Sequence, residues 1–322
     1  MTPVASVVVA VRDGRETIAR AVRSALDQSL RDLEVIVVDD ASRDGTAAAA
    51  RGAADGDARL RVLTLAANLG PSGARNRGFA AARGRWIAVL DADDAFAPER
   101  LARLVALGEA RGADMICDDL MLVDEETGAA LGPMAGADGL PETIDAAAFV
   151  RGNLPDRSNP RRGYGFLKPV LRAAFLRAHG LAYDEDMRFA EDYAFALACL
   201  LHGASWATMR APLYRYAVRG DSLTGRHGAA DLTRLCAVDE RALASPAAAR
   251  DPDLRRALAA HLVSVRKRER WAAFIDHVKA RRLAALPGVA AHSPPVLAHI
   301  AAQLLKQAVL RSGRAAARLG RR

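Results

Sequence analysis

Three carboxylates stand close together directly after a short apolar segment. Asp91, Asp93 and Asp94 lie within four residues, following the apolar run at residues 86–90. Carboxylates this close repel one another, and a divalent cation relieves that repulsion. Their hard oxygen atoms favour Mg²⁺ or Mn²⁺. The run is a candidate metal site, and the alternative is a solvated turn in which Asp94 only caps the next helix near Pro98.

A second acidic pair, Glu191 and Asp192, precedes an apolar stretch of helical spacing. Either carboxylate has the chemistry to take a proton from an attacking hydroxyl. The alternative is structural, because acidic side chains in the first turn of a helix interact favourably with its dipole. Taken alone, the pair is compatible with both roles.

Polar residues also follow two earlier apolar runs. Asp13 and Asp40 stand just after these runs, where a carboxylate can accept from a nucleobase N–H or from ribose hydroxyls. Between Asp40 and the acidic run lies a glycine-rich turn in which Gly70 and Gly73 allow a tight bend. Arg75 follows one turn inside the next helix. These positions predict a polar crevice for a nucleotide.

The elements that must position these residues alternate between strand and helix. Apolar, β-branched runs predict strands at residues 4–11, 33–38, 60–65 and 86–90, and helical spacing predicts helices at residues 16–28, 46–54 and 72–82. This alternation predicts a mainly parallel sheet covered on both faces. Ligands bind beyond the carboxyl ends of such strands, so the aspartates are expected to share one crevice.

The rest of the chain divides less sharply. Residues 128–159 are rich in Gly, Pro and Ala and predict loops, whereas ordered elements are expected at 166–177, 191–202 and 206–216. Beyond residue 231 the pattern is helical. We expect a domain at 1–230, divided into halves at 1–125 and 126–230, followed by a helical region at 231–322.

Composition bounds the setting of the protein. The three cysteines, Cys117, Cys199 and Cys236, lack metal-ligand spacing and predict buried thiols in a reducing compartment. No apolar run is long enough to cross a bilayer, and the start carries no signal segment, which predicts a cytoplasmic protein. Residues 279–322 hold nine Lys plus Arg and no acidic residue, against 37 basic and 38 acidic residues before them. This tail is expected to meet an anionic surface.

Phospholipid is the favoured surface. The tail contains no aromatic residue for base stacking, which argues against nucleic acid. Apolar residues at helical spacing in 297–310, with basic residues nearby, predict an amphipathic helix at a membrane interface. The alternative is a helix packed on the body, or a disordered tail.

Four segments together resemble family-2 glycosyltransferases. They are VDDASRDGT at 38–46, NLGPSGARNRG at 68–78, DADD at 91–94 and the ED pair at 191–192, in the order and spacing typical of that family. The resemblance implies the GT-A fold, a nucleotide-sugar donor and a divalent metal, with 1–125 as the donor half and 126–230 as the acceptor half of the catalytic domain. It implies that Asp40 reads the nucleobase, that Asp93 lies near ribose and metal, and that Asp94 ligates the metal, with Asp91 in support.

Further roles follow from the same resemblance. Asp192 is expected to be the general base, with Glu191 facing outward or positioning the acceptor. Arg75 is expected to orient the acidic turn (residues 91–94) or to touch the diphosphate. Where the family usually has an aromatic residue for the base, this chain has Ala10, Val11, Arg12 and Asp13, so the planar guanidinium of Arg12 is the expected stacking partner. Arg219 and Ser222 match a segment that closes over the diphosphate.

Residues 156–169 and 183–188 look like bacterial succinoglycan-type exopolysaccharide glycosyltransferases in particular. In that reading Lys168, Arg161 and Arg162 meet the pyrophosphate of a lipid-linked acceptor, and Tyr164 and Phe166 stack on a sugar ring. A packed loop explains the aromatic residues equally well.

The expected function is an inverting, metal-dependent hexosyltransferase of exopolysaccharide assembly. It would use a UDP-sugar, UDP-glucose as the first choice, and a lipid-linked oligosaccharide at the inner face of the plasma membrane. The alternative is a non-catalytic nucleotide-sugar-binding or scaffold protein with the same fold.

Overall fold

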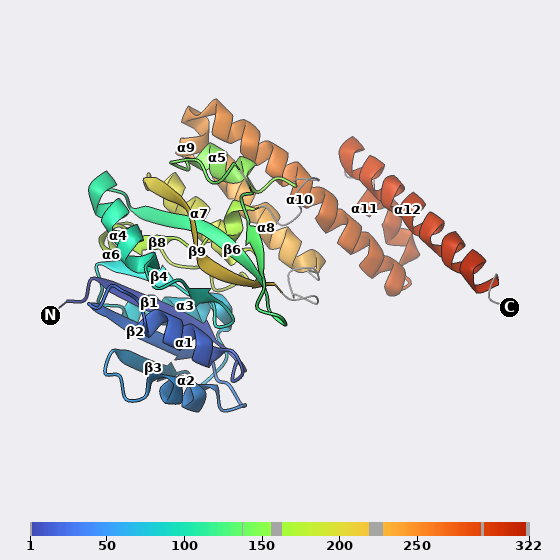
Figure 1. The fold of residues 1–322 in the computed structure, drawn as a ribbon. Coiled ribbons are helices and arrows are strands. Elements are labelled where there is room, and N and C mark those ends of the chain that lie inside the picture. Colours follow the sequence, from blue (N-terminus) through green and yellow to red (C-terminus); the bar gives the residue numbers. More distant parts are fainter. Residues whose placement is uncertain (1, 137, 156–162, 219–227, 291–292, 320–322) are drawn as a thin grey trace. The chain divides into compact units, whose positions relative to one another are not determined.

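A computed structural model describes residues 2–136, 138–155, 163–218, 228–290 and 293–319 of the chain (Figure 1). The chain forms two units, Met1–Leu223 and Thr224–Arg322, and each is described by itself. The first unit is built on one mixed sheet, and the second is helical throughout its described residues.

Four parallel strands form the first half of the sheet, in the order β3-β2-β1-β4 (Figure 1). They are β1 (Ala5–Val11), β2 (Leu33–Asp39), β3 (Leu60–Thr64) and β4 (Trp86–Val89). Every residue of β2 and β4 is buried, which is why β4 and residues 35–38 of β2 read as continuous apolar runs. The four strands expected from the sequence are confirmed, and their carboxyl ends share one edge of the sheet.

Helices α1 (Ile18–Leu26), α2 (Thr46–Ala54) and α3 (Gly70–Ala81) make the crossovers. Right-handed connections put α1 and α2 on one face and, because the chain doubles back from β3 to β4, α3 on the other. α3 packs closely on β1: a Cβ placed on Gly78 would lie 2.3 Å from Val8 Cγ1. The glycine at residue 78 therefore allows the approach that fixes the height of α3 above the sheet.

The second half of the sheet continues in the order β8-β6-β9-β5, with β7 on the side of β6. Its strands are β5 (Ala95–Phe96), β6 (Met115–Asp124), β7 (Ala130–Pro133), β8 (Val170–Arg172) and β9 (Trp206–Val218). The remaining elements are α4 (Arg100–Arg111), α5 (Ala146–Arg151), η1 (Tyr164–Phe166), α6 (Ala173–His179) and α7 (Glu191–Leu201). β8 runs antiparallel between β4 and β6, which makes the sheet mixed.

Glu34 is a buried carboxylate that ties β2 to its neighbours. Its oxygens accept from the Ser6 hydroxyl at 2.7 Å, from the Arg83 backbone N–H at 2.8 Å and from the Arg61 guanidinium at 3.1 Å. Burial alone would raise the pKa of Glu34, but these donors and the Arg83 guanidinium hold it below its usual value. The ionised form is therefore favoured by folding.

Because folding lowers the pKa of Glu34, its ionised carboxylate stabilises the folded state. This stabilisation should be complete at pH values above the unfolded-state pKa and should be lost as the pH falls through the lower, folded-state pKa. We expect Glu34→Gln to lower the free energy of unfolding by about 1–3 kcal/mol at pH 7. The difference from wild type should shrink as the pH falls below about 4.5, the ordinary pKa of Glu. Urea unfolding at pH 7 and at acid pH measures both values, and a difference independent of pH would contradict the role.

The second unit consists of α8 (Ala229–Leu243), α9 (Pro246–Arg250), α10 (Pro252–Lys279), η3 (Leu283–Ala285), α11 (Leu286–Ala290) and α12 (Pro294–Leu319). Ser245 and Asp251 cap α9 and α10, and each is followed by a proline at the first helical position. A small core of Phe274, Val289, Val296 and Ile300 joins α10, α11 and α12.

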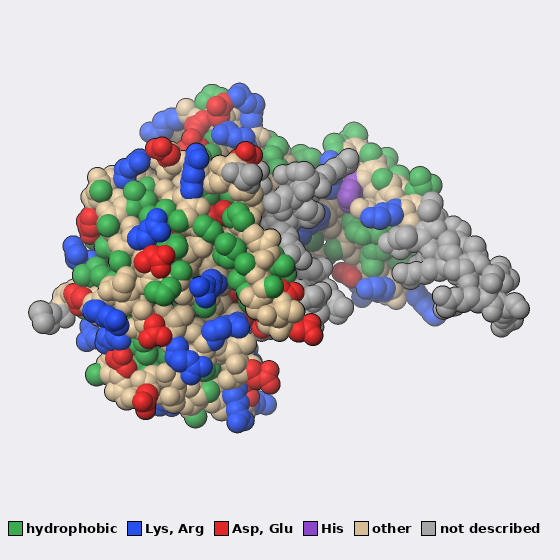
Figure 2. All heavy atoms as spheres, viewed as in Figure 1, with side chains coloured by type: hydrophobic (Ala, Val, Ile, Leu, Met, Phe, Trp, Pro, Cys, Tyr) green, Lys and Arg blue, Asp and Glu red, His purple; other side chains and the backbone are tan. Residues whose placement is uncertain are grey.

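Other expectations from composition can be compared with the structure. All three cysteines are buried and free, as predicted. Within the described parts of the chain, no helix has the length and apolar character needed to span a membrane. Side chains of both charges are interspersed over the face of the first unit seen in Figure 2.

Candidate active site

Four charged side chains form a closed ring at the carboxyl edge of the parallel strands. Arg75 Nη2 lies 2.8 Å from Asp91 Oδ1, and Arg75 Nη1 lies 3.4 Å from Asp192 Oδ1. Lys168 Nζ lies 2.8 Å from Asp91 Oδ2 and 2.6 Å from Asp192 Oδ2. The charges alternate around the ring, so each carboxylate contacts both cations. The structure thus brings together three predicted site residues, Arg75, Asp91 and Asp192.

Separate elements supply the ring. Asp91 follows β4, whose pairing with β1 extends to a hydrogen bond from Leu90 N–H to the Val8 carbonyl. Arg75 is carried by α3, and Asp192 stands in the first turn of α7. Lys168 enters just before β8, where the antiparallel register of Val170 with Ala88 brings it beyond the end of β4.

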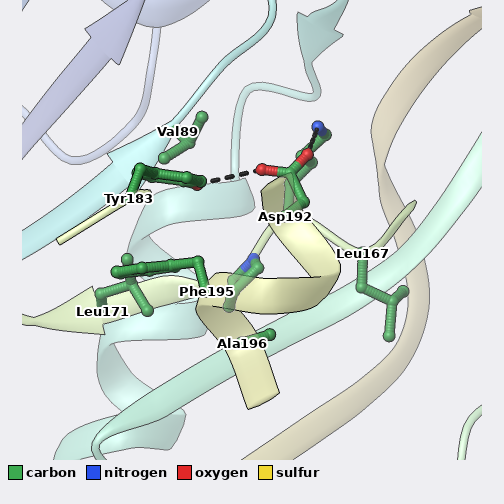
Figure 3. A pocket seen from close by; sticks show the side chains of 9 residues that line it. Val89, Leu167, Leu171, Tyr183, Asp192, Phe195 and Ala196 are labelled. Carbon is green, nitrogen blue, oxygen red and sulfur yellow. Dashed lines mark hydrogen bonds and ion pairs between the residues drawn. The ribbon is translucent and has the colours of Figure 1, made fainter. Parts of the chain in front are cut away.

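Two neighbours complete the surroundings of the expected base. Tyr183 donates its hydroxyl to Asp192 Oδ1 at 3.0 Å, and Figure 3 shows this contact. The Tyr183 ring stacks on Phe195 with centroids 4.3 Å apart and lies under the Arg75 guanidinium at 5.2 Å. Glu191 accepts from Arg75 Nη1 at 2.8 Å, so it is turned toward the ring and does not face outward. Asp192 is therefore held from several sides.

Burial and charge set the protonation of this ring. Burial would raise the pKa of Asp91, but the Lys168 and Arg75 cations lower it well below its usual value. Burial would lower the pKa of Lys168, but the Asp192 and Asp91 carboxylates raise it well above its usual value. Burial and the Asp192 charge raise the pKa of Tyr183. Asp91, Lys168 and Arg75 are therefore charged at neutral pH, and Tyr183 is a neutral donor.

Asp94 stands in the same acidic turn but has a different environment. It is buried, and its oxygens accept from the Tyr214 hydroxyl and from the Ala217 N–H, both at 2.7 Å. Among the described residues, no cationic side chain pairs with it. Burial, Asp91 and Asp93 raise its pKa well above the usual value. A buried carboxylate without a cation would gain from a divalent ion.

The acidic turn fits such an ion by its chemistry. Asp93 and Asp94 offer hard oxygen ligands, and Mg²⁺ typically takes one or two carboxylates and fills its other positions with water and phosphate oxygens. Among the described residues, no group of three or more His, Cys, Asp or Glu side chains is arranged for a metal. Asp91 is neutralised by Arg75 and Lys168, so it supports the turn without being needed as a ligand.

The residues expected to meet the nucleotide lie at the same edge, in neighbouring loops. Both oxygens of buried Asp40 accept backbone N–H groups at the start of α3, from Leu69 at 2.7 Å and from Gly70 at 2.9 Å. Asp40 thereby fixes the helix that carries Arg75. Ala10 is half-buried, two residues before the exposed Arg12.

Asp13 has a positive φ of 48° and accepts from the Arg43 N–H at 2.9 Å, which joins the loops after β1 and β2. The Arg12 guanidinium lies 3.4 Å from this carboxylate and stays largely in solvent. These contacts place Asp13 and Arg12 on an open rim, where their expected contacts to a nucleotide remain predictions.

The structure corrects the expectation for Lys168, whereas several other residues expected to bind the acceptor or the diphosphate lie outside its described part. Lys168 does not face an acceptor pyrophosphate, because its ammonium is buried between Asp91 and Asp192. Tyr164 is buried, and a Cβ on Gly152 would meet its ring at 2.4 Å, so it packs the loop as the alternative proposed. Phe166 remains exposed. Arg161, Arg162, Arg219 and Ser222 lie outside the described residues.

Sequence reasoning missed the roles of Lys168, Tyr183 and Tyr214. A Lys-Pro pair before a strand and two tyrosines in strand-like or loop segments are common patterns. Only the antiparallel insertion of β8 and the length of β9 bring Lys168 and Tyr214 to the acidic turn. The one local signal was the position of Tyr183 shortly before the ED pair.

A small, mostly apolar cavity lies beside Asp192. It is lined by Val89, Leu167, Lys168, Pro169, Leu171, Tyr183, Asp192, Phe195 and Ala196 and has room for about one water molecule. Figure 3 shows Asp192 at the start of α7, with Phe195 and Ala196 further along the same helix and Val89 beside Tyr183.

Sequence and structure comparisons show which known proteins the chain resembles. The chain is 38% identical over 271 residues to the succinoglycan biosynthesis protein ExoU of Rhizobium meliloti, covering 84% of this chain and 78% of that protein. Staphylococcus aureus TarS 1-349 in complex with UDP-GlcNAc superposes with a TM-score of 0.65 at 17% identity, covering 88% and 90% of the two chains.

A mannosyltransferase from Pyrobaculum calidifontis, in complex with GDP-Man and Mn²⁺, gives a TM-score of 0.57 at 20% identity, covering 96% of this chain and 81% of that one. The model of the Glycosyl transferase family 2 matches residues 6–164, which include β1 to β4, α3 and the acidic turn. With the GT-A fold shared with TarS, the chain belongs to glycosyltransferase family 2.

Proposed function

We propose that the protein is an inverting glycosyltransferase that moves a hexose from a UDP-sugar to a lipid-linked oligosaccharide in exopolysaccharide biosynthesis. The observation that carries the proposal is the carboxylate of Asp192, fixed by Lys168 and Tyr183 beside the acidic turn. A general base next to a diphosphate site is what a single in-line displacement requires.

The donor side rests on the loops at the carboxyl edge of the sheet. TarS in complex with UDP-GlcNAc supports a UDP-sugar as the donor. Each Asp40 oxygen accepts one backbone N–H and has a lone pair free, with which it would accept from the nucleobase. Arg12 would stack on the nucleobase, with Ala10 and Asp13 beside it. Arg219 and Ser222 would close over the diphosphate. Glucose is the first sugar to test.

The chemistry needs one proton acceptor and one place for negative charge. Asp192 would take the proton of the acceptor hydroxyl, and Oδ2 has the fewer contacts, because Oδ1 already faces Tyr183 and Arg75. Attack from the face opposite the leaving diphosphate inverts the anomeric centre. A divalent ion held by Asp93 and Asp94 would supply positive charge to that diphosphate. Arg75 and Lys168 hold the base and the turn in register.

The acceptor proposal rests on similarity to ExoU, a succinoglycan biosynthesis protein. A lipid-linked acceptor would place the enzyme at the inner face of the membrane. A family-2 fold without a membrane-spanning helix among its described residues would reach that surface as a peripheral protein.

The function is tested by a donor screen with Mn²⁺ present. We expect one UDP-sugar to raise the melting temperature, because a ligand that binds only the folded state stabilises it by mass action. The same donor should release UDP slowly to water and faster with a lipid-linked acceptor. Binding without UDP release from any donor would favour the non-catalytic alternative. The absence of both binding and release with every donor would contradict the proposal.

The basic tail is proposed to bind an anionic membrane. In α12, Val296 and Ile300 are buried on the helical core, whereas Leu297, Leu304 and Leu305 are 52%, 45% and 70% exposed. This exposed apolar face lies in a segment without acidic residues, which fits an interfacial helix.

We expect the protein to bind vesicles containing phosphatidylserine, with binding that weakens as salt rises. Replacing Leu297, Leu304 and Leu305 together with Ser should reduce binding in a sedimentation assay. This variant keeps the core contacts of α12, whereas deletion after residue 278 would uncover Phe274. Equal binding by the triple variant, or equal binding to neutral vesicles, would contradict membrane attachment through this segment.

A further inference from the structure

Lys168 is the least expected member of the charged ring, because a buried lysine is costly unless its charge is matched. Its side chain is 6% exposed, and its ammonium touches Oδ2 of Asp91 and Oδ2 of Asp192 at 2.8 and 2.6 Å. It therefore connects the acidic turn that follows β4 to the first turn of α7. No other described lysine pairs with two carboxylates.

The backbone of Lys168 is fixed as firmly as its side chain. Pro169 follows it and restricts its backbone to an extended conformation. Its carbonyl accepts from Arg100 Nη2 at 2.7 Å. Arg100 is fully buried and paired with Asp118 at 2.7 Å. This second buried ion pair holds the segment that delivers the ammonium to the ring.

The same buried pair also supports the acidic turn from its other side. The Arg100 guanidinium lies over the Tyr214 ring at 5.0 Å from its centroid. Tyr214 donates to Asp94 at 2.7 Å and accepts from the Asp91 N–H at 3.1 Å. One rigid frame thus sets the positions of both Lys168 and the acidic turn.

We propose that Lys168 is a positioning residue that holds the general base Asp192 at a fixed place relative to Asp91, and so relative to the reacting centre, before the acceptor binds. The inference rests on the proposed function, because it gives Lys168 a role in that reaction. Lys168 acts through Asp192 and not on the donor, since both its contacts go to carboxylates inside the protein. Arg75 bridges the Oδ1 atoms of the same two residues, so Lys168 fixes the rotation of each carboxylate.

Lys168→Met removes the charge and keeps the length of the side chain. We expect kcat for UDP release to fall about 10²-fold, the cost of a misplaced catalytic group. The donor Kd, measured by thermal shift with UDP-sugar and Mn²⁺, should stay within about threefold of wild type. Lys168→Arg should recover part of kcat because it restores the charge. Lys267→Met, the same change in the second unit, is the matched control and should leave kcat unchanged.

A double-mutant cycle separates positioning from other roles. If Lys168 acts through Asp192, adding Lys168→Met to Asp192→Asn should cost less than about threefold in kcat, because the residue it positions is already inactive. The inference would be overturned if the loss of kcat in the double variant equalled the product of the losses in the two single variants. A donor Kd that rises in proportion to the loss of kcat would also overturn it. Should the Met variant fail to show a cooperative thermal transition, Lys168→Gln takes its place in the same cycle.

The wild-type protein measured first keeps the two proposals apart. No UDP release from any donor by wild type would remove the proposed function, and the positioning role with it. Release by wild type together with multiplicative losses would overturn the positioning role alone.

Discussion

Asp192→Asn is expected to reduce UDP release by about 10²–10⁴-fold, the usual contribution of a general base. The amide occupies the same volume and can still accept from the Tyr183 hydroxyl at Oδ1, while its Nδ2 replaces the oxygen that pairs with Lys168, so the Tyr183 contact persists and the Lys168 ion pair is lost. It cannot take a proton from an acceptor hydroxyl. Steady-state kinetics with saturating donor and Mn²⁺ measure the loss in kcat.

The control for this variant is Asp32→Asn, which makes the same change in an exposed residue before β2, at the amino edge of the sheet. It should retain wild-type kcat. The donor-induced rise in melting temperature should be similar in both variants and in wild type, because neither residue is expected to touch the nucleotide. Full activity of Asp192→Asn would exclude Asp192 as the base, and Glu191, which also reaches Arg75, would then be the next carboxylate to test.

Removal of divalent cations is expected to suppress UDP release by at least about 10²-fold, because a bound ion contributes several kcal/mol to charge stabilisation at the leaving diphosphate. Dialysis against EDTA followed by kinetics measures the loss, and added Mn²⁺ or Mg²⁺ should restore the rate. Activity that survives chelation unchanged would contradict a metal-dependent mechanism.

Asp94→Asn tests the metal site independently, because we expect it to stabilise the metal-free protein while it impairs activation by Mn²⁺. Folding raises the pKa of Asp94, so at neutral pH the ionised carboxylate opposes folding, and this opposition is absent at pH values below its unfolded pKa. The neutral amide should therefore raise the melting temperature in metal-free buffer. The same variant should lose the rate increase produced by Mn²⁺. A melting temperature below that of wild type would indicate that Asp94 serves the fold and not a cation.

Much of the fold follows from local pattern. The β-branched runs at β1, β2 and β4 predicted buried parallel strands because such strands are covered on both faces and need no polar alternation. Parallel strands end at one edge, which is why the sequence by itself placed Asp13, Asp40 and Asp91 at a common site. The helical spacing in α1 and the acidic start of α7 were equally local signals.

The separate roles within the acidic turn were decided only by tertiary structure. Asp91 and Asp94 have the same side chain and lie three residues apart. Asp91 meets two cations, whereas Asp94 is buried against Tyr214 and pairs with no cationic side chain in the described part of the chain. The difference arises because Lys168 arrives on the segment before β8, inserted antiparallel beside β4, and Tyr214 arrives on β9. Strand order and register depend on the packing of the whole sheet, and no spacing within the sequence records them.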